Sequence, residues 1–192
     1  MNTFLSTENT RFQLLPKTTQ QIILLYTKGT SNKIFNQRHS LTDPYTNKLV
    51  PTINLDKTVK YYKNGKKHRD EDLPAVIRSY RVEYYKMGQI HRDDDRPAII
   101  WTHGTLEYYK VGQRHRDGDR PAVRHPDGTL EYYKWGQHHR DGDLPAVVSR
   151  NKTQEYYQNG QQHRDGDNPT IIYKNGRLEY YKNGQQYTPN IE

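Results

Sequence analysis

A repeat of about 24 residues governs most of this chain and limits the folds open to it. The second member of each tyrosine pair lies at Tyr62, Tyr85, Tyr109, Tyr133, Tyr157 and Tyr181, so successive copies are 23 and then four times 24 residues apart. The unit reads EYYKxGQxHRDGDxPAxxxxxGxL, with variations. Such regular spacing indicates that each copy takes an equivalent place and contacts mainly its neighbours. We therefore divide the chain into residues 1–55 and a tandem array over residues 56–192.

Within one unit the residue pattern predicts strands and turns. Short runs such as Leu130–Tyr133 and Ala146–Val148 are separated by segments with Gly, Asp and Pro, and no helical period is present. Two adjacent tyrosines on a strand place one ring on each face of the sheet. We expect an all-β, elongated array of about six antiparallel β-hairpin repeats, with a β-solenoid as the alternative. A short mixed or helical N-terminal cap completes this expected fold.

A two-residue turn at Asn64-Gly65 sets a hairpin register that continues through the array, with Tyr61 opposite His68. Counting on, tyrosine faces histidine at Tyr84–His91, Tyr108–His115, Tyr132–His139 and Tyr156–His163. Glutamate faces arginine at Glu83–Arg92, Glu107–Arg116, Glu131–Arg140 and Glu155–Arg164. Because such cross-strand pairs contribute about 0.2–1 kcal/mol each, we assign these residues a structural role.

The residue before the turn glycine is Asn in three units and apolar in the three units between them. Met87, Val111 and Trp135 hold the apolar positions. Since a β-branched residue disfavours positive φ, we expect a type II turn, or a type I turn with a bulge, at Val111. Turn tips are normally polar, so the apolar ones indicate a contact site for a partner. The alternative is that these side chains fold back over neighbouring hairpins.

Composition alone is close to that of a disordered chain. Hydrophobic residues make up 31%, the mean hydropathy is -1.21 and the net charge is +8. The 17 tyrosines offset this, because a phenol ring buries a large apolar area and keeps its hydroxyl group available. The absence of Cys excludes disulfides and thiolate metal sites. These numbers favour a thin sheet faced with tyrosine.

Residues 1–55 lack the repeat. Leu15-Pro16 and the apolar residues that follow predict a short helix near 17–28, ended by Gly29, and then a connector. We interpret this segment as a cap over the first open edge of the sheet. The alternative is an F-box-like recruiting segment, because an F-box also opens with Leu-Pro. No run approaches the ~18 apolar residues needed to cross a bilayer, and residues 1–10 lack the order of a signal peptide.

Two chemical interpretations of the repeated His-Arg-Asp were considered. It resembles the catalytic loop of protein kinases, but the chain has no Gly-rich loop and no Asp-Phe-Gly, and it carries near-copies of the motif. The pattern of His139, Asp141 and Asp143 gathers imidazole and carboxylate groups, and acidic turns bind calcium in other repeat arrays. Asp residues more often close turns, and a catalytic site requires one asymmetric pocket. We expect no enzyme activity, no metal and no cofactor.

The units resemble MORN-type repeats, specifically the YYxNGxxHRxxGPA variant abundant in large DNA viruses and some phages. The resemblance covers about Lys60 to Gln186 and rests on the Tyr-Tyr, the turn Gly and the His-Arg-Asp followed by Pro-Ala. Here DGD or DDD and a variable residue stand where the family has Gly directly before Pro. The resemblance implies an elongated all-β array that contacts proteins or membrane surfaces without catalysis. A viral origin implies a virion-associated or virus–host interaction protein.

The expected function is a non-catalytic scaffold for protein–protein assembly, with self-association through sheet edges as one form of it. The expected location is intracellular and soluble, in the host cytoplasm or the virion. The alternative is a nucleic-acid-binding module that uses rows of Tyr and Lys. Residues 56–192 hold 24 basic against 20 acidic residues, so the charge of the array is nearly balanced. That balance makes a nucleic-acid partner the weaker interpretation.

Overall fold

The computed structural model describes residues 51–189, and all 24 regular elements in this range are β-strands. The expected all-β array of antiparallel hairpin repeats is confirmed. The helix predicted near 17–28 lies outside the described residues. The chain divides into two compact units, with the boundary between Thr105 and Leu106.

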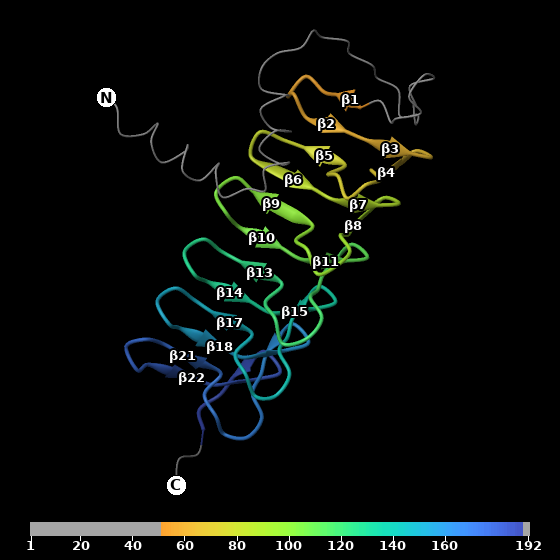
Figure 1. Cartoon of the computed structure of the whole chain (residues 1–192). Coiled ribbons are helices and arrows are strands. Elements are labelled where there is room, and N and C mark those ends of the chain that lie inside the picture. Colours follow the sequence, from red (N-terminus) through yellow and green to blue (C-terminus); the bar gives the residue numbers. More distant parts are fainter. Residues whose placement is uncertain (1–50, 190–192) are drawn as a thin grey trace, which may run out of the picture. The chain divides into compact units, whose positions relative to one another are not determined.

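Each repeat contributes strands to a main ladder and one separate tip hairpin. In the first unit the main-ladder strands are β1 (Thr52–Ile53), β2 (Val59–Lys60), β5 (Val76–Ile77), β6 (Arg81–Glu83) and β9 (Ile99–Trp101). Its tip hairpins are β3 (Tyr62–Lys63) with β4 (Lys66–Lys67), and β7 (Tyr85–Lys86) with β8 (Gln89–Ile90). The main ladder of this unit has the order β1-β2-β5-β6-β9 (Figure 1).

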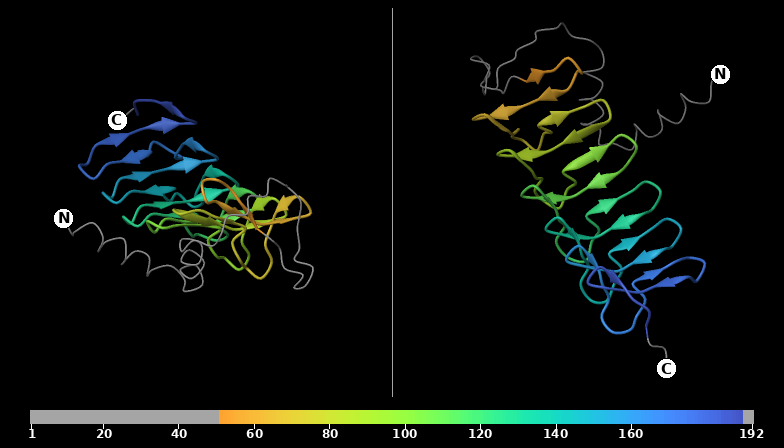
Figure 2. Two further views of the ribbon diagram at one scale, coloured as in Figure 1. Left: turned by 90° about the horizontal axis from the view of Figure 1, so that it is seen from above. Right: turned by 180° about the vertical axis from the view of Figure 1, so that it is seen from behind.

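The second unit repeats the same plan. Its main-ladder strands are β10 (Leu106–Glu107), β13 (Val123–Arg124), β14 (Leu130–Glu131), β17 (Val147–Val148), β18 (Gln154–Glu155), β21 (Ile171–Ile172) and β22 (Leu178–Glu179), in this order. Its tip hairpins are β11 (Tyr109–Lys110) with β12 (Gln113–Arg114), β15 (Tyr133–Lys134) with β16 (Gln137–His138), β19 (Tyr157–Gln158) with β20 (Gln161–Gln162), and β23 (Tyr181–Lys182) with β24 (Gln185–Gln186). Figure 2 shows the main-ladder strands of this unit side by side from behind.

The chain path explains why one repeat needs both ladders. From β14 the chain passes through Tyr132 into β15, turns into β16 and continues through a loop to β17. β17 then pairs antiparallel with β14 and, on its other edge, with β18 of the next repeat. At the crossing point the Tyr132 N–H donates to the carbonyl of Ala146 at 2.7 Å. Each repeat therefore joins its own strands and its neighbour's in one meander.

The core is thin and contains the first tyrosine of every pair but the last, where Tyr180 is only half-buried. Tyr61, Tyr84, Tyr108, Tyr132 and Tyr156 are buried, together with the alanine of the Pro-Ala step and small aliphatic residues of the main ladder. The second tyrosine of each pair is only half-buried. The first ring of these pairs therefore belongs to the core, whereas the second ring lies partly at the surface.

All six hairpin turns have the same backbone conformation. Both turn residues have positive φ, for example 51° at Val111 and 79° at Gly112, and Lys110 pairs with Gln113 across the turn. The type II or bulged turn expected at Val111 is wrong, because a two-residue hairpin loop with two left-handed residues is a type I′ turn. This turn matches the twist of the strands, and the repeat requires the same turn in every unit.

The turn glycine is required by its backbone conformation. The φ of Gly160 is 82°, in the left-handed region, and a Cβ there would make only an ordinary contact with the Gln137 side chain at 3.5 Å. The Gly160 N–H donates to the carbonyl of His138 at 2.9 Å. The turn residue therefore also links its hairpin to the preceding one through its backbone.

Candidate interaction surface

The histidine of each repeat connects one hairpin to the next. The Nδ1 atoms of His68, His115, His139 and His163 accept the backbone N–H of Met87, Trp135, Asn159 and Asn183, at 3.1–3.3 Å. Because Nδ1 accepts, the ring proton of the neutral imidazole lies on Nε2. Nε2 in turn contacts the Asp two residues later, at 2.9 Å for His139 and Asp141. The imidazole therefore acts as a bridge between two backbone segments.

The expected register between tyrosine and histidine is confirmed in the backbone. The N–H of His91, His115, His139 and His163 donates to the carbonyl of Tyr84, Tyr108, Tyr132 and Tyr156 respectively, at 3.1–3.2 Å. The tyrosine ring, however, is covered by an arginine rather than by the histidine. The Arg116 guanidinium lies 3.7 Å from the Tyr108 ring centroid, and Arg140 lies 3.8 Å from that of Tyr132.

Each of these arginines makes several contacts at once. Beyond its stacking on Tyr132, Arg140 donates Nη1 to the Pro145 carbonyl at 3.2 Å, and it donates Nε and Nη2 to the two carboxylate oxygens of Asp119 at 2.6 and 2.8 Å. Asp119 belongs to the preceding repeat, and the Arg140 hydrogen bond lowers the pKa of its carboxyl group. A bidentate fork of this kind is specific to Arg.

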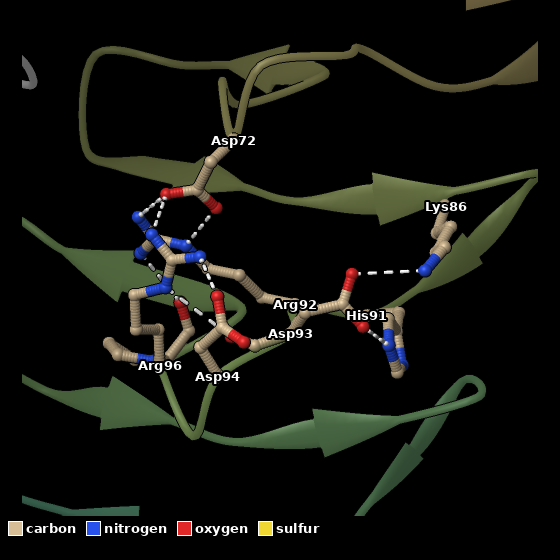
Figure 3. Close-up of polar contacts among 8 residues, drawn as sticks. Asp72, Lys86, His91, Arg92, Asp93, Asp94 and Arg96 are labelled. Atoms are coloured by element: carbon tan, nitrogen blue, oxygen red, sulfur yellow. Dashed lines mark hydrogen bonds and ion pairs between the residues drawn. The ribbon is translucent and has the colours of Figure 1, made fainter.

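The first unit contains the same bridge, shown in Figure 3. Arg92 binds Asp72 of the preceding repeat at 2.8 and 2.7 Å, and Arg96 binds the same carboxylate. In the same loop, directly after Arg92, Asp93 accepts from Lys86 at 3.0 Å and from His91 at 2.9 Å. The His91 hydrogen bond, followed by that of Lys86, lowers the pKa of Asp93.

The expected pairing of glutamate with arginine across the hairpin is wrong. Glu131 pairs with Val123 and Val147 on the main ladder, whereas Arg140 follows the tip hairpin. The reason is the break at Tyr132, where the strand leaves the main ladder and enters the hairpin. The glutamates instead accept a hydrogen bond from the second tyrosine of their own repeat, at Glu83–Tyr85, Glu107–Tyr109, Glu131–Tyr133, Glu155–Tyr157 and Glu179–Tyr181.

The other hydrogen bonds to these glutamates come from residues that differ from one repeat to the next. Glu131 accepts from the Nε2 atoms of His138 at 3.1 Å and His125 at 2.7 Å, and from the Tyr133 hydroxyl at 2.8 Å. These hydrogen bonds, that of His138 foremost, lower the pKa of Glu131 to about 2. Burial would raise the pKa of Glu83, but Arg81, Tyr85 and Arg78 outweigh it and the net shift is downward. These carboxylates are therefore structural acceptors held in their charged form.

Hollows lie between successive loops in each unit. One of about 250 Å³ is lined by His68–Leu73 and by His91–Asp94 of the next loop, and one of about 290 Å³ is lined by His115–Arg120 and His139–Asp141. The Asp residues of these walls that belong to the His-Arg-Asp motif are bound by Lys and His. Within residues 51–189 no group of three or more His, Asp or Glu side chains is placed to hold a metal ion.

The three apolar turn residues are exposed. Met87, Val111 and Trp135 expose 45%, 52% and 48% of their surface. One face of the Trp135 ring stacks on His115 of the preceding hairpin, with centroids 4.2 Å apart and planes at 9°. The Trp135 side chain therefore folds back over the preceding hairpin, as the alternative interpretation expected, but only one face of its ring is covered. The other half of its surface remains accessible.

The sequence interpretation missed the second Asp of the loop, at Asp72, Asp119 and Asp143, as the carboxylate that links repeats through arginine. Its recurrence 20 or 21 residues before the arginine of the next His-Arg pair was the available signal. No helix long and apolar enough to span a membrane occurs within residues 51–189. Comparison with protein-family models and with curated proteins gives no match.

Proposed function

We propose that this protein is a non-catalytic, protein-binding repeat scaffold of the MORN type whose contact surface includes the apolar turn tips Met87, Val111 and Trp135. The observation that carries this proposal is that the junction between repeats does not require these side chains. Asn159 and Asn183 donate the same backbone hydrogen bond to histidine that Met87 and Trp135 donate. Asn also tolerates positive φ better than Val or Trp.

The energetic argument supports a role outside folding. A non-glycine residue in the left-handed region costs roughly 1–2 kcal/mol, and Asn has the lowest cost among the alternatives. Three tips nevertheless carry apolar side chains that remain about half exposed. Exposed apolar side chains at strained positions are typical of contact sites. We assign them to a protein partner, because aromatic residues and Met are enriched at protein interfaces.

The polar contacts support this assignment over enzyme activity and over nucleic-acid binding. The Arg, His and Asp residues repeated in the loops are engaged by neighbouring groups, which fits an architectural role. A nucleotide base needs an accessible aromatic face for stacking, but the first tyrosine of each of the first five repeats is buried beneath an arginine. The lysine that follows the tyrosine pair is bound by Asp, as in Lys134–Asp141.

The test compares three full-length proteins. One is wild type, one carries Met87→Asn, Val111→Asn and Trp135→Asn, and the matched control carries Asn at the exposed hairpin residues Gln89, Gln113 and Gln137. Each is immobilised and exposed to the same cell extract. We expect proteins retained by the wild type and the control to be lost from the turn-tip variant, which stays folded by circular dichroism. Identical retention by all three folded proteins would contradict the proposal.

A second measurement addresses the nucleic-acid alternative. Wild-type protein is titrated with a single-stranded oligonucleotide at increasing salt. The scaffold proposal predicts no stoichiometric complex at physiological salt. A complex whose affinity falls steeply with salt would instead support nucleic-acid binding by the rows of Tyr and Lys.

A further inference from the structure

The main ladder has one face that the tip hairpins reach and one that points away from them. The Tyr85 hydroxyl donates to the Glu83 carboxylate at 3.0 Å, so the second tyrosine lies on the same face as the glutamate. Val82 directly precedes Glu83 on β6, and side chains alternate along a strand, so Val82 points to the opposite face. We call the residues in register with Val82 and with its equivalents across the ladder the outer row.

The outer row of the first compact unit is apolar throughout and almost completely buried. It consists of Ile53, Val59, Ile77, Val82 and Ile100, which pair in this order across the ladder. Val59 and Val82 expose 1% of their surface, and Ile77 and Ile100 expose 3%. Side chains stand roughly perpendicular to a sheet, so neighbouring strands shield their sides and leave their ends open. Burial of this degree therefore requires a cover over the row.

The second compact unit shows how much burial the strands provide by themselves. Its outer row consists of Leu106, Arg124, Leu130, Val148, Gln154, Ile172 and Leu178. Each of these side chains is half-buried or exposed, and Leu178 exposes 44% of its surface. Leu130 is only half-buried although it has a strand on either side. Both units have the same ladder and tip hairpins, so these elements do not account for the burial in the first.

The sequence before β1 contains a segment suited to cover this row. Residues 22–26 read Ile-Ile-Leu-Leu-Tyr and form the longest uninterrupted apolar run of the chain, in which only 31% of residues are hydrophobic. Such a run is unfavourable in water and is stabilised by contact with another apolar surface. Residues 1–50 belong to the first compact unit, the same unit whose outer row is covered.

Length and charge both favour the row of the first unit as the partner of this run. Residues 27–51 join the run to β1 and span up to about 80 Å when extended, whereas the row from β1 to β9 is about 19 Å wide. Residues 18–27 carry no charged side chain, and neither does the outer row of the first unit. The outer row of the second unit contains Arg124, whose charge would be costly to bury beneath an apolar segment.

We infer that residues 22–26 bind the outer row of the first compact unit in the same molecule and cover Val59, Ile77, Val82 and Ile100. The contact lies across a face of the ladder, whereas the cap expected from the sequence lies along the β1 edge. It explains why the same row is buried in one unit and partly accessible in the other. It involves none of the apolar turn tips, so it stands independently of the proposed contact surface.

The first experiment measures the accessibility of a single thiol, since the natural chain contains no Cys. Full-length Val82→Cys is compared with Leu130→Cys, which holds the equivalent position two repeats later. Each folded protein is treated with iodoacetamide. We expect the thiol at position 82 to react at least about tenfold more slowly, because a covered thiol reacts only when its cover opens.

The apolar run is then altered in both proteins. Ile23→Asp with Leu24→Asp should raise the reaction rate at position 82 at least about tenfold and leave the rate at position 130 unchanged. The matched control, Gln20→Asp with Gln21→Asp, adds the same charge beside the run and should leave both rates unchanged. Full protection at position 82 in the folded Ile23→Asp, Leu24→Asp protein would overturn the inference.

Cross-linking keeps the inference testable if that variant does not fold by circular dichroism. A short bismaleimide should join Leu24→Cys to Val82→Cys within one chain, at the mass of a monomer, and should not join Leu24→Cys to Leu130→Cys. Absence of the first cross-link in the folded protein would overturn the inference. A mixture of the separate Leu24→Cys and Val82→Cys proteins should give no cross-linked dimer. A dimer would overturn the assignment to the same molecule, because the segment would then come from a second copy.

Discussion

The Nδ1 atom of His139 accepts the backbone N–H of Asn159, twenty residues later, at 3.1 Å. The same ring contacts Asp141 through Nε2 at 2.9 Å. One imidazole therefore fixes the loop of its own repeat and the turn of the next. The repeated His-Arg-Asp motifs accordingly connect each hairpin to the next.

Replacing His139 by Ala should lower the free energy of unfolding by about 1–2 kcal/mol, because two hydrogen bonds are lost. His139→Asn should cost less, since its side-chain oxygen can accept the Asn159 N–H in place of Nδ1. Urea unfolding followed by circular dichroism measures both. Equal losses for Ala and Asn would argue against a role for the Nδ1 acceptor.

Arg140 should be sensitive even to a conservative change. Arg140→Ala removes the stacking on Tyr132, the bond to Pro145 and the fork on Asp119, and we expect a loss of about 2–3 kcal/mol. Arg140→Lys keeps the charge but not the planar fork, so it should lose about half as much. Asp119→Asn serves as the control and should cost under about 1 kcal/mol, because the carboxylate is more than half exposed. If Arg140→Lys is as stable as the wild type, the stacked fork contributes little.

Val111→Asn should stabilise the protein by about 1 kcal/mol, because Asn relieves a β-branched residue at a φ of 51°. The reverse change at an equivalent turn, Asn159→Val, should destabilise by a similar amount. Thermal unfolding of both variants measures the pair. A loss of stability in Val111→Asn would mean that the Val side chain contributes to folding rather than to contacts.

Glu131 should give the protein an acid-sensitive component of stability. Its pKa falls from 4.5 to about 2 on folding, so the charged form stabilises the fold fully above about pH 4.5. That stabilisation is lost as the pH falls through about 2. Glu131→Gln should be less stable than the wild type by about 1–2 kcal/mol at pH 7, and the difference should shrink toward pH 2. A difference that does not change with pH would contradict the ionic role of Glu131.

The repeat fold could be predicted because local rules determine it. The x-Gly turn and the alternation of side chains fix the tip register, with Tyr62 opposite Lys67. The same counting failed for Glu131 and Arg140, because it assumes one unbroken strand. The strand breaks at Tyr132, where a hydrogen bond to Ala146 redirects the chain. A break of this kind depends on a residue 14 positions away and leaves no mark in the local pattern.

The contacts between repeats were predictable only in part. The strict period shows that neighbours touch, but it does not show that Asp119 rather than Glu131 accepts from Arg140. The turn at Val111 is a second case, in which the local preference of the residue predicts the wrong conformation. Its own preference disfavours a type I′ turn, and the geometry shared by all six hairpins overrides that preference.

Amide hydrogen exchange at three equivalent asparagines tests the central structural claim most directly. Asn64, Asn159 and Asn183 hold the same turn position with φ of 50–51°, but among residues 51–189 a histidine accepts the N–H of Asn159 and of Asn183 and none accepts that of Asn64. We predict protected amides at Asn159 and Asn183, rapid exchange at Asn64, and loss of protection at Asn159 in His139→Ala. Equal exchange rates at all three positions would contradict the claim that the histidines join successive repeats.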